Sequence, residues 1–226
     1  MATYAERGLD FNYRPRLKIS EVFHSLQGEG AHAGLPCTFI RLVGCALRCN
    51  YCDSAYAFYG GAWWSFEALR NYADERQCPL IQITGGEPLH QKAVWPFCDL
   101  LVGAGYQVLI ETSGAVSIAG LHPGTHVVMD LKTPESGEAD RNLWSNLDLL
   151  KPTDEIKFVV CSDADLTWSL AKVRELDLDK RFQVLISPVA ESDSRAAWAE
   201  RVAASGLRIR FQLQLHKILW GDVRGR

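Results

Sequence analysis

Residues 41–60, "RLVGCALRCNYCDSAYAFYG", hold the most informative part of this sequence. An apolar run ends here, and three of the chain's seven cysteines, Cys45, Cys49 and Cys52, follow within eight positions. A structural zinc site takes four ligands, and a disulfide takes two. The odd number of clustered thiols therefore calls for a different explanation.

Apolar strands and amphipathic helices alternate around this stretch. Strands are expected at 17–26, 38–44, 79–84, 106–114, 126–132, 155–160, 181–188 and 207–215. Helices are expected at 65–76, 94–101, 143–150, 162–173 and 198–206, with Ser65 and Ser162 as N-caps. Near-continuous apolar strands that alternate with helices are typical of an α/β fold with a parallel sheet covered by helices. Periodicity alone does not distinguish an open sheet from a partial barrel.

Polar and glycine-containing segments follow the expected strands. These segments are "GCALRCNYCDS", "TGGEP", "ETSG", "DLKTP", "ISP" and "LHK". In parallel α/β folds, ligands bind at the C-terminal ends of the strands. We therefore expect a single domain over 1–226, with 1–16 as an N-terminal tail and the functional site at this edge of the sheet.

Composition limits the possible function classes. The 226 residues are 47% hydrophobic and 23% charged, and 24 Lys and Arg against 27 Asp and Glu give a formal charge of −3. These values are typical of a folded globular protein, and no basic stripe favours a direct nucleic-acid partner. The polar N-terminus lacks the apolar run of a signal peptide, and no stretch approaches the length of a membrane span. We expect a cytoplasmic protein without membrane contact, whose thiols stay reduced.

Three ordinary explanations compete for the clustered cysteines. A zinc site lacks a fourth ligand, because the histidines nearest in sequence, His24, His32 and His90, show no partner spacing. A thioredoxin-type pair would use only "CNYC". Inert buried thiols do not suit three cysteines in one polar loop. A cubane iron–sulfur cluster remains, in which three thiolates leave one iron open for a substrate or cofactor.

The C-x3-C-x2-C spacing, with the aromatic Tyr51 before the last cysteine, resembles the signature of the radical S-adenosylmethionine (SAM) enzymes. The resemblance implies a partial (β/α)6 barrel of parallel strands and a 4Fe-4S cluster on the three cysteines. In those enzymes SAM chelates the open iron, one electron breaks its S–C5′ bond, and the 5′-deoxyadenosyl radical abstracts a substrate hydrogen. "TGGEP" resembles their "GGE" element, which meets the methionine amino group. SAM contacts are accordingly expected at Tyr51, Cys52, Asp53, Gly86, Glu87, Ser113, Asp130, Lys132 and Ser187.

Segments on both sides of the triad narrow the resemblance. They are "FHSLQGEG" at 23–30, "FIRLVGC" at 39–45, "CDS" at 52–54 and "QLHKILWG" at 214–221. Together they resemble the 7-carboxy-7-deazaguanine synthase family, lyases of queuosine and related 7-deazapurine biosynthesis, from about residue 19 to the C-terminus. In that family the radical removes the C6 hydrogen of 6-carboxy-5,6,7,8-tetrahydropterin. The pyrazine ring then contracts, ammonia leaves and 7-carboxy-7-deazaguanine forms.

The family resemblance also implies roles for individual residues. Gln27 and Glu29 suit the pterin edge, Arg41 suits a substrate carboxylate, and Ser54 matches the position of the family's Mg2+ ligand. Substrate contacts are expected at Leu26, Gln27, Gly28, Glu29, Arg41, Thr84 and His216. The sequence departs from the family in two places: "DLKTP" replaces a "SPK"-like segment, and the chain continues past "HK" to Arg226, which would have to fold back to reach the substrate.

Two other functions stay open at this point. A glycyl-radical-enzyme activase shares the triad and the small size, but must admit a protein loop and needs neither pterin-edge residues nor magnesium. A non-catalytic iron–sulfur protein would not cleave SAM. The family implies a flavodoxin or ferredoxin as reducing partner and a homodimer, for which Trp63, Trp64 and Trp220 are candidate interface residues.

Overall fold

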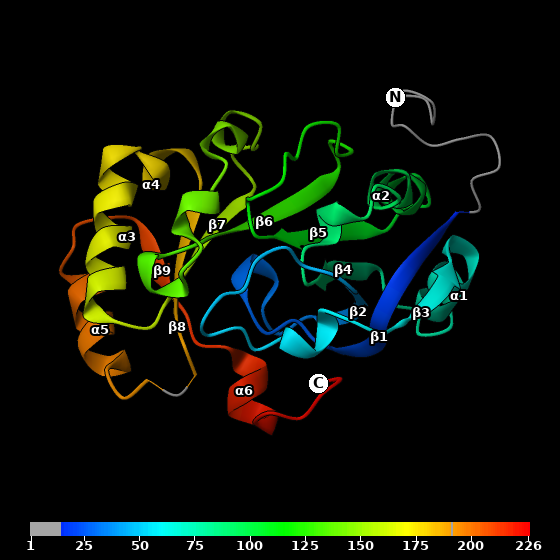
Figure 1. Cartoon of the computed structure of the whole chain (residues 1–226), viewed down its shortest axis with the longest axis horizontal. Coiled ribbons are helices and arrows are strands. Elements are labelled where there is room, and N and C mark those ends of the chain that lie inside the picture. The colour runs from blue at the N-terminus through cyan, green and yellow to red at the C-terminus, as the bar shows by residue number, and fades with distance from the viewer. Residues whose placement is uncertain (1–14, 191) are drawn as a thin grey trace.

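The computed structural model describes residues 15–190 and 192–226, so most of the expected tail at 1–16 lies outside the described residues. Within them, one sheet has nine strands in the order β3-β1-β2-β4-β5-β6-β7-β8-β9 (Figure 1). The strands are β1 Arg16–Leu26, β2 Pro36–Leu42, β3 Ala62–Ser65, β4 Leu80–Gly85, β5 Gln107–Thr112, β6 Thr125–Leu131, β7 Glu155–Val160, β8 Gln183–Pro188 and β9 Ile209–Phe211.

The strands from β2 through β4 to β9 are all parallel to their neighbours, which confirms the expected parallel α/β sheet. The order leaves β3 and β9 at the two edges, as in a barrel that does not close. β1 differs from the expectation, because it is antiparallel to both β2 and β3. A parallel crossover needs a dozen or more residues, and the loop at 27–35 is shorter, so it can only reverse the chain. No sequence pattern predicted β3.

The helices are α1 Phe66–Asp74, α2 Val94–Gly103, α3 Asp163–Glu175, α4 Leu178–Arg181, α5 Arg195–Ala203 and α6 Leu215–Trp220. Figure 1 shows α1 beside β1 and β3 at one end of the sheet, and α3, α4 and α5 at the other. Both expected N-caps are confirmed: Ser65 Oγ accepts from the Ala68 N–H at 3.1 Å, and Ser162 Oγ accepts from the Asp165 N–H at 3.1 Å. Each cap satisfies a backbone donor that the first turn leaves unpaired.

Two expected elements are wrong in type or length. The helix expected at 143–150 is a short 3-10 turn, Trp144–Asp148. Its buried Asn146 donates to the Gly114 and Val116 carbonyls, so loop contacts rather than a helical ladder hold the segment. The strand expected at 207–215 ends at Phe211, and α6 follows. The Leu215 N–H donates to the Gly28 carbonyl at 3.0 Å, because the chain leaves the sheet there and crosses to the loop after β1.

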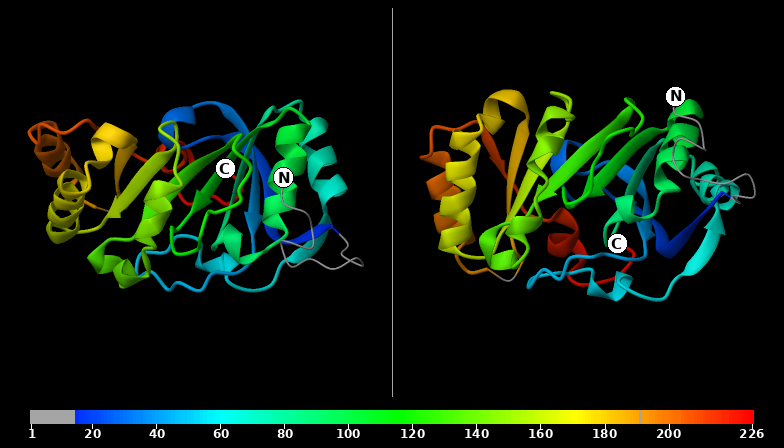
Figure 2. Two further views of the ribbon diagram at one scale, coloured as in Figure 1. Left: turned by 90° about the horizontal axis from the view of Figure 1, so that it is seen from above. Right: turned by 45° about the horizontal axis from the view of Figure 1, so that its top comes forward.

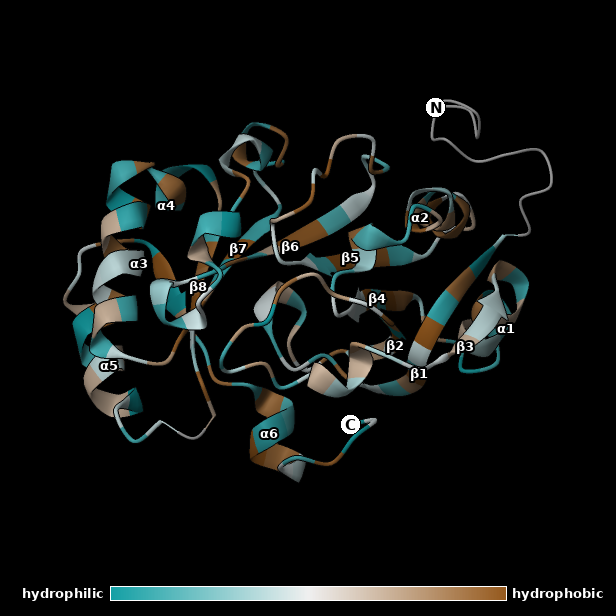
Figure 3. Ribbon diagram, viewed as in Figure 1, coloured by the Kyte–Doolittle hydropathy of each residue, from teal (hydrophilic) through white to brown (hydrophobic). Residues whose placement is uncertain are grey.

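One apolar core joins the sheet to its helices and fixes the strand ends. Ile40, Ile83 and Phe158 from the strands pack with Phe97 of α2 and Trp198 of α5, each at most 2% exposed. Figure 3 shows apolar residues concentrated on the central strands β4 to β7. No helix among residues 15–190 and 192–226 has the length and apolar character required to cross a membrane.

Candidate active site

A pocket lies at the C-terminal ends of the parallel strands, where the sequence predicted the site. The loop after β1, the cysteine loop after β2 and the ends of β4, β5, β6 and β7 all contribute to its lining. Figure 2 shows α6 and the C-terminal segment (red) beside the loop after β2 (cyan), and both His216 and Arg226 line the pocket. Strand ends far apart in the sequence therefore converge on one cavity.

The pocket brings together almost all of the residues that the sequence singled out. The lining includes all three clustered cysteines, Ser54, every expected substrate contact, and every expected SAM contact except Glu87 and Ser187. Ser187 is 1% exposed within β8, and its neighbours Val189 and Ala190 face the pocket instead. The pattern of polar segments after strands thus located the site, while the inward or outward direction of single side chains needed the structure.

The three clustered cysteines are free and half-buried in the loop that follows β2. The Glu138 carboxylate anchors this loop by accepting the Arg48 N–H at 2.6 Å. Burial raises the pKa of each thiol, that of Cys49 to about 11, while the nearby Lys132 ammonium acts in the opposite direction. The metal-free thiols are therefore protonated near pH 7, and iron would displace their protons on binding. Three such thiols fit a 4Fe-4S cluster with one open iron.

The glycine pair after β4 lies against the cysteine loop. A Cβ on Gly86 would lie 2.3 Å from the Gly44 oxygen and 2.7 Å from Cys45 Cβ, so only glycine fits there. The Glu87 carboxylate is fully buried and accepts from the Ser113 N–H at 2.7 Å and the Ser113 hydroxyl at 2.5 Å. Glu87, for which we expected a SAM contact, therefore holds the end of β5 in place, while Gly86 and Ser113 face the pocket.

The segment after β6 supplies a buried acceptor next to the cysteines. Asp130 Oδ2 pairs with Lys132 Nζ at 3.0 Å, whereas Asp130 Oδ1 is buried with no hydrogen-bond partner among the described residues. Burial lowers the pKa of Lys132, but Asp130, Cys49 and Tyr51 together outweigh burial and raise it, so this lysine stays charged. The Tyr51 hydroxyl is held by Thr133 Oγ1 at 3.2 Å. An unpaired buried carboxylate oxygen calls for a donor, and a hydroxyl or ammonium group of SAM would supply one.

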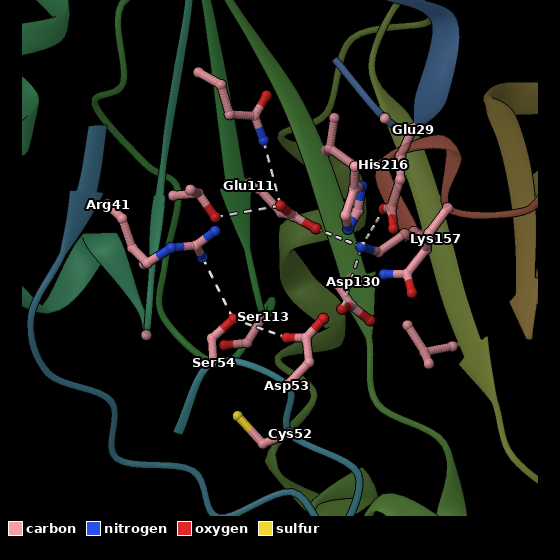
Figure 4. Close-up of a pocket in the computed structure, with 18 of the residues that line it drawn as sticks. Glu29, Arg41, Cys52, Asp53, Ser54, Glu111, Ser113, Asp130, Lys157 and His216 are labelled. Carbon is pink, nitrogen blue, oxygen red and sulfur yellow. Dashed lines mark hydrogen bonds and ion pairs between the residues drawn. The ribbon is translucent and has the colours of Figure 1, made fainter. Parts of the chain in front are cut away.

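A network of charges fills the inner part of the pocket (Figure 4). Lys157 Nζ forms an ion pair with Glu111, lies 2.8 Å from Glu29 Oε2 and lies 3.7 Å from Asp130 Oδ2. Burial raises the pKa of Glu111, but Lys157, with smaller contributions from Arg41 and Lys132, outweighs burial and lowers it to about 2. Glu29 and Glu111 both present carboxylate oxygens to the cavity as acceptors, and the Lys157 ammonium pairs with each of them.

Sequence reasoning missed Glu111, Lys157 and Gln82, all of which line the pocket. Glu111 accepts from Gln82 Nε2 at 3.3 Å and from Thr84 Oγ1 at 3.2 Å, so it organises its neighbours as well. A signal was present in the sequence, because a charged residue inside the apolar strands "VLIET" and "EIKFVV" is uncommon in a buried position. Such a residue in a near-continuous apolar strand points into the barrel.

The loop after β1 presents its polar residues to the pocket through internal contacts. Gln27 Nε2 donates to Gln82 Oε1 at 2.9 Å, and Gln27 Oε1 accepts from the Glu29 N–H at 3.3 Å. A Cβ on Gly28 would lie 2.2 Å from His216 Nδ1, so any larger residue here would displace the His216 ring. Burial lowers the pKa of His216 despite the nearby Glu29, and its imidazole is neutral near pH 7. The "LQGEG" segment at 26–30 thus packs directly against α6.

Arg41 and Ser54 form a separate polar corner of the pocket. Arg41 Nε donates to Glu21 Oε1 at 2.7 Å, and Arg41 NH1 donates to Ser54 Oγ at 3.4 Å. The Ser54 hydroxyl donates to Asp53 Oδ1 at 2.8 Å. A hydroxyl and a carboxylate side by side are oxygen ligands of the kind that Mg2+ prefers. The guanidinium is anchored by Glu21 at Nε and by Ser54 at NH1, and it lines the pocket, where it can bind an anion.

No protein-family model matches the chain. Among curated proteins, the 7-carboxy-7-deazaguanine synthase of Koribacter versatilis is 38% identical over 221 residues, which cover 90% of this chain and 97% of that protein. The enzyme of the same name from Thermoplasma acidophilum is 37% identical over 209 residues, which cover 92% of this chain and 99% of that protein. The one from Chlorobaculum tepidum is 35% identical, with 92% of this chain and 97% of that protein covered.

Solved structures agree with these relatives. QueE from Escherichia coli superposes with a TM-score of 0.72 at 27% identity, covering 87% of this chain and 94% of that chain. SuiB from Streptococcus suis, solved bound to S-adenosylmethionine, superposes with a TM-score of 0.50 at 14% identity, covering 75% of this chain and 48% of that chain. At that identity the second likeness shows the fold alone.

Proposed function

The chain belongs to the 7-carboxy-7-deazaguanine synthase family and is thus a radical SAM enzyme of 7-deazapurine biosynthesis. On this basis we propose which pocket residues bind the cluster, SAM and the substrate. Cys45, Cys49 and Cys52 would hold the 4Fe-4S cluster, and Tyr51, Gly86, Ser113, Asp130 and Lys132 would surround SAM. When bound, the cluster and SAM supply one electron and a 5′-deoxyadenosyl radical. Everything else in the reaction depends on how the chain orients the substrate.

The substrate that the pocket fits is 6-carboxy-5,6,7,8-tetrahydropterin. A pterin edge offers N–H donors, and the carboxylate oxygens of Glu29 and Glu111 face the cavity as acceptors. Lys157 holds both carboxylates in position, because its ammonium lies between them. The arrangement of two acceptors around one buried cation is the observation that carries the substrate assignment, since it matches a guanine-like edge and not an extended peptide.

The substrate carboxylate would lie at the opposite corner, beside Arg41. The guanidinium can accept it through paired N–H donors, and a magnesium ion held by Ser54 would neutralise the remaining charge. Asp53, which accepts from the Ser54 hydroxyl, supports that position. With the pterin edge fixed at Glu29 and Glu111 and the carboxylate fixed at Arg41, the C6 hydrogen between them would face the cysteine side of the pocket.

Neutral His216 on α6 would close the pocket over the substrate. Its ring lies against Gly28, and the Leu215 N–H donates to the Gly28 carbonyl at 3.0 Å, so α6 and the loop after β1 form one unit. An imidazole that is neutral near pH 7 can donate from one nitrogen and accept at the other. We propose it as a substrate contact, and we propose the exclusion of water as the second effect of α6.

Partners and assembly extend the proposal. Leu213, Ile218, Leu219 and Val223 are each at least 40% exposed around α6, and an apolar surface of this kind supports a homodimer. Trp63 is 55% exposed on β3 and carries Arg16 over its ring, so it is a second interface candidate. A flavodoxin or ferredoxin would supply the electron, and the cytoplasm is the proposed location.

Turnover under anaerobic conditions tests the assignment. The cluster-loaded protein is mixed with SAM, a low-potential reductant, Mg2+ and 6-carboxy-5,6,7,8-tetrahydropterin, and the products are separated by mass. We expect 7-carboxy-7-deazaguanine and ammonia in equal amounts. Cleavage of SAM without any deazapurine would contradict the substrate assignment while leaving the radical SAM chemistry intact.

A further inference from the structure

A second cluster of ligand-type side chains lies at the other end of the strands, away from the cysteines. His126 is the second residue of β6, and Glu155 is the first residue of β7. His32 comes from the 3-10 turn at Gly30–His32 in the loop after β1. Their ligand atoms all lie within 4.8 Å of one another. The active site described above uses none of the three, and the sequence showed no partner spacing for His32.

The geometry of this cluster is defined by short contacts. His126 Nε2 lies 2.8 Å from Glu155 Oε1, and the His32 and His126 rings meet edge to face with centroids 5.2 Å apart. Gln107 Nε2 lies 2.7 Å from His32 Nε2 and holds that ring from its outer side. Glu155 is 1% exposed, whereas both histidines are half-buried, so solvent reaches the cluster from the histidine side only.

The same three residues connect the substrate loop to the sheet. The Ala31 N–H donates to Glu155 Oε2 at 3.0 Å, and two residues earlier in the loop Glu29 pairs with Lys157 at 2.8 Å. Glu155 and Lys157 are two residues apart on β7, so their side chains lie on the same face of the strand and both point into the barrel. The loop therefore has two attachments to one strand, with Glu29 on the active-site side and His32 on the far side.

We propose that His32, His126 and Glu155 form a binding site for a divalent transition-metal ion, with zinc as the best match. Two imidazoles and one carboxylate are a ligand set that Zn2+ accepts, with water in the fourth position. A carboxylate has about four lone-pair sites, so Glu155 can bind the ion and still accept the Ala31 N–H. The ion would tie the loop at 27–35 to β6 and β7 from the side opposite the substrate.

The cluster differs from a simple buried ion pair in its third member. His126 and Glu155 alone would satisfy each other. His32 joins them from a third element, with its ring against His126 and held by Gln107. The three residues come from three separate elements, and their ligand atoms converge within 4.8 Å of one another. A metal ion requires this arrangement of ligands. Gly30 supports the close approach, since a Cβ there would lie 2.8 Å from Glu155 Oε2.

Zinc retention by the cluster-loaded protein tests the proposal. The parent, His32→Gln and His126→Gln are dialysed anaerobically against Zn2+ buffered by a chelator, and zinc and iron are counted per chain over a range of free zinc. His24→Gln is the matched control, because His24 is an exposed histidine on β1, outside the cluster. Glutamine keeps a hydrogen-bonding amide at each position, and the two variants change two different elements of the fold, the turn at Gly30–His32 and β6.

We expect about one zinc per chain in the parent and in His24→Gln, with affinity at least about 10-fold lower in both His32→Gln and His126→Gln. Iron should be the same in all four proteins. Three results would overturn the site: no zinc in the parent, zinc binding unchanged by both cluster variants, or zinc uptake matched by loss of iron. The last result would place the ion at the cysteines.

Discussion

Replacing Lys157 by methionine removes the cation around which three active-site carboxylates are arranged. The Lys157 side chain is 5% exposed and pairs with Glu29, Glu111 and Asp130, whose side chains are 15%, 27% and 13% exposed. Methionine keeps the length and apolar stem of the side chain without the charge. Glu29 and Glu111 would then lose their shared ammonium partner, while Asp130 would keep only its ion pair with Lys132.

The expected loss of stability follows from the burial of this network. Removing one partner of a buried ion pair costs about 3–5 kcal/mol, because the other charge stays buried. Since water reaches Glu111 in part, we take the lower end, about 3 kcal/mol. For a domain of this size 1 kcal/mol moves Tm by about 2–4 °C, so Lys157→Met should melt about 6–12 °C below the parent.

The pH dependence gives the same experiment a second readout. In the parent, the Glu111 pKa of about 2 lies below its ordinary value of 4.5, so its contribution is present above pH 4.5 and is lost as pH falls toward 2. In Lys157→Met the contribution of Lys157 is lost, and burial raises the Glu111 pKa against the weaker effects of Arg41 and Lys132. In the variant, protonation of Glu111 would then occur at a higher pH than in the parent and would remove a buried charge that has lost its ion-pair partner. The difference in Tm between Lys157→Met and the parent should therefore narrow as pH falls from 7 toward 5.

Thermal melts of the parent, Lys157→Met and Lys180→Met at pH 7 and pH 5 test this reasoning. Lys180 is the control, because it pairs with Asp177 at the surface with its side chain 73% exposed. Lys180→Met should have the same Tm as the parent at both pH values. A Lys157→Met variant that melts within about 2 °C of the parent, or whose deficit is the same at both pH values, would refute the account of the charge network.

Three further changes test the rest of the site. Cys49→Ala should abolish the brown 4Fe-4S chromophore and SAM cleavage together, because two thiolates cannot hold the cluster; unchanged iron per chain in that variant would remove Cys49 from the ligand set. Ser54→Ala should flatten the dependence of turnover on Mg2+ while cluster content stays constant, whereas parallel Mg2+ titrations of variant and parent would remove Ser54 from the site. Gly86→Ala should lower iron content and SAM affinity, since its Cβ would meet the Gly44 oxygen at 2.3 Å, and a variant with parental SAM binding would show that the cysteine loop moves aside freely.

The alternation of apolar strands with polar segments was enough to predict the parallel sheet and the position of the site. The segments after β2, β4, β5 and β6 converge on one pocket because parallel strands present the same ends to the same side. The N-caps Ser65 and Ser162 were also readable, since their hydrogen bonds are local. These features depend on short sequence distances or on a periodicity that the whole fold shares.

What the sequence could not predict depends on long-range contacts. β1 alternates like any other strand, and only the short loop to β2 makes it antiparallel. His216 was expected directly after a strand, because "RIRFQLQL" continues the alternation up to Leu215. Instead the strand ends at Phe211, the Leu215 N–H donates to the Gly28 carbonyl, and His216 lies on α6. Glu87 matched a motif, yet its carboxylate turns inward to Ser113, from a segment 26 residues away in the sequence.

The hydrogen that leaves the substrate offers the most direct test of the proposed reaction. The measurement uses 6-carboxy-5,6,7,8-tetrahydropterin carrying deuterium at C6, with the cluster-loaded protein, SAM and reductant, and follows the mass of the 5′-deoxyadenosine formed. Our account predicts deuterium in 5′-deoxyadenosine together with the appearance of 7-carboxy-7-deazaguanine. Unlabelled 5′-deoxyadenosine formed alongside the deazapurine, or labelled 5′-deoxyadenosine without it, would contradict the account.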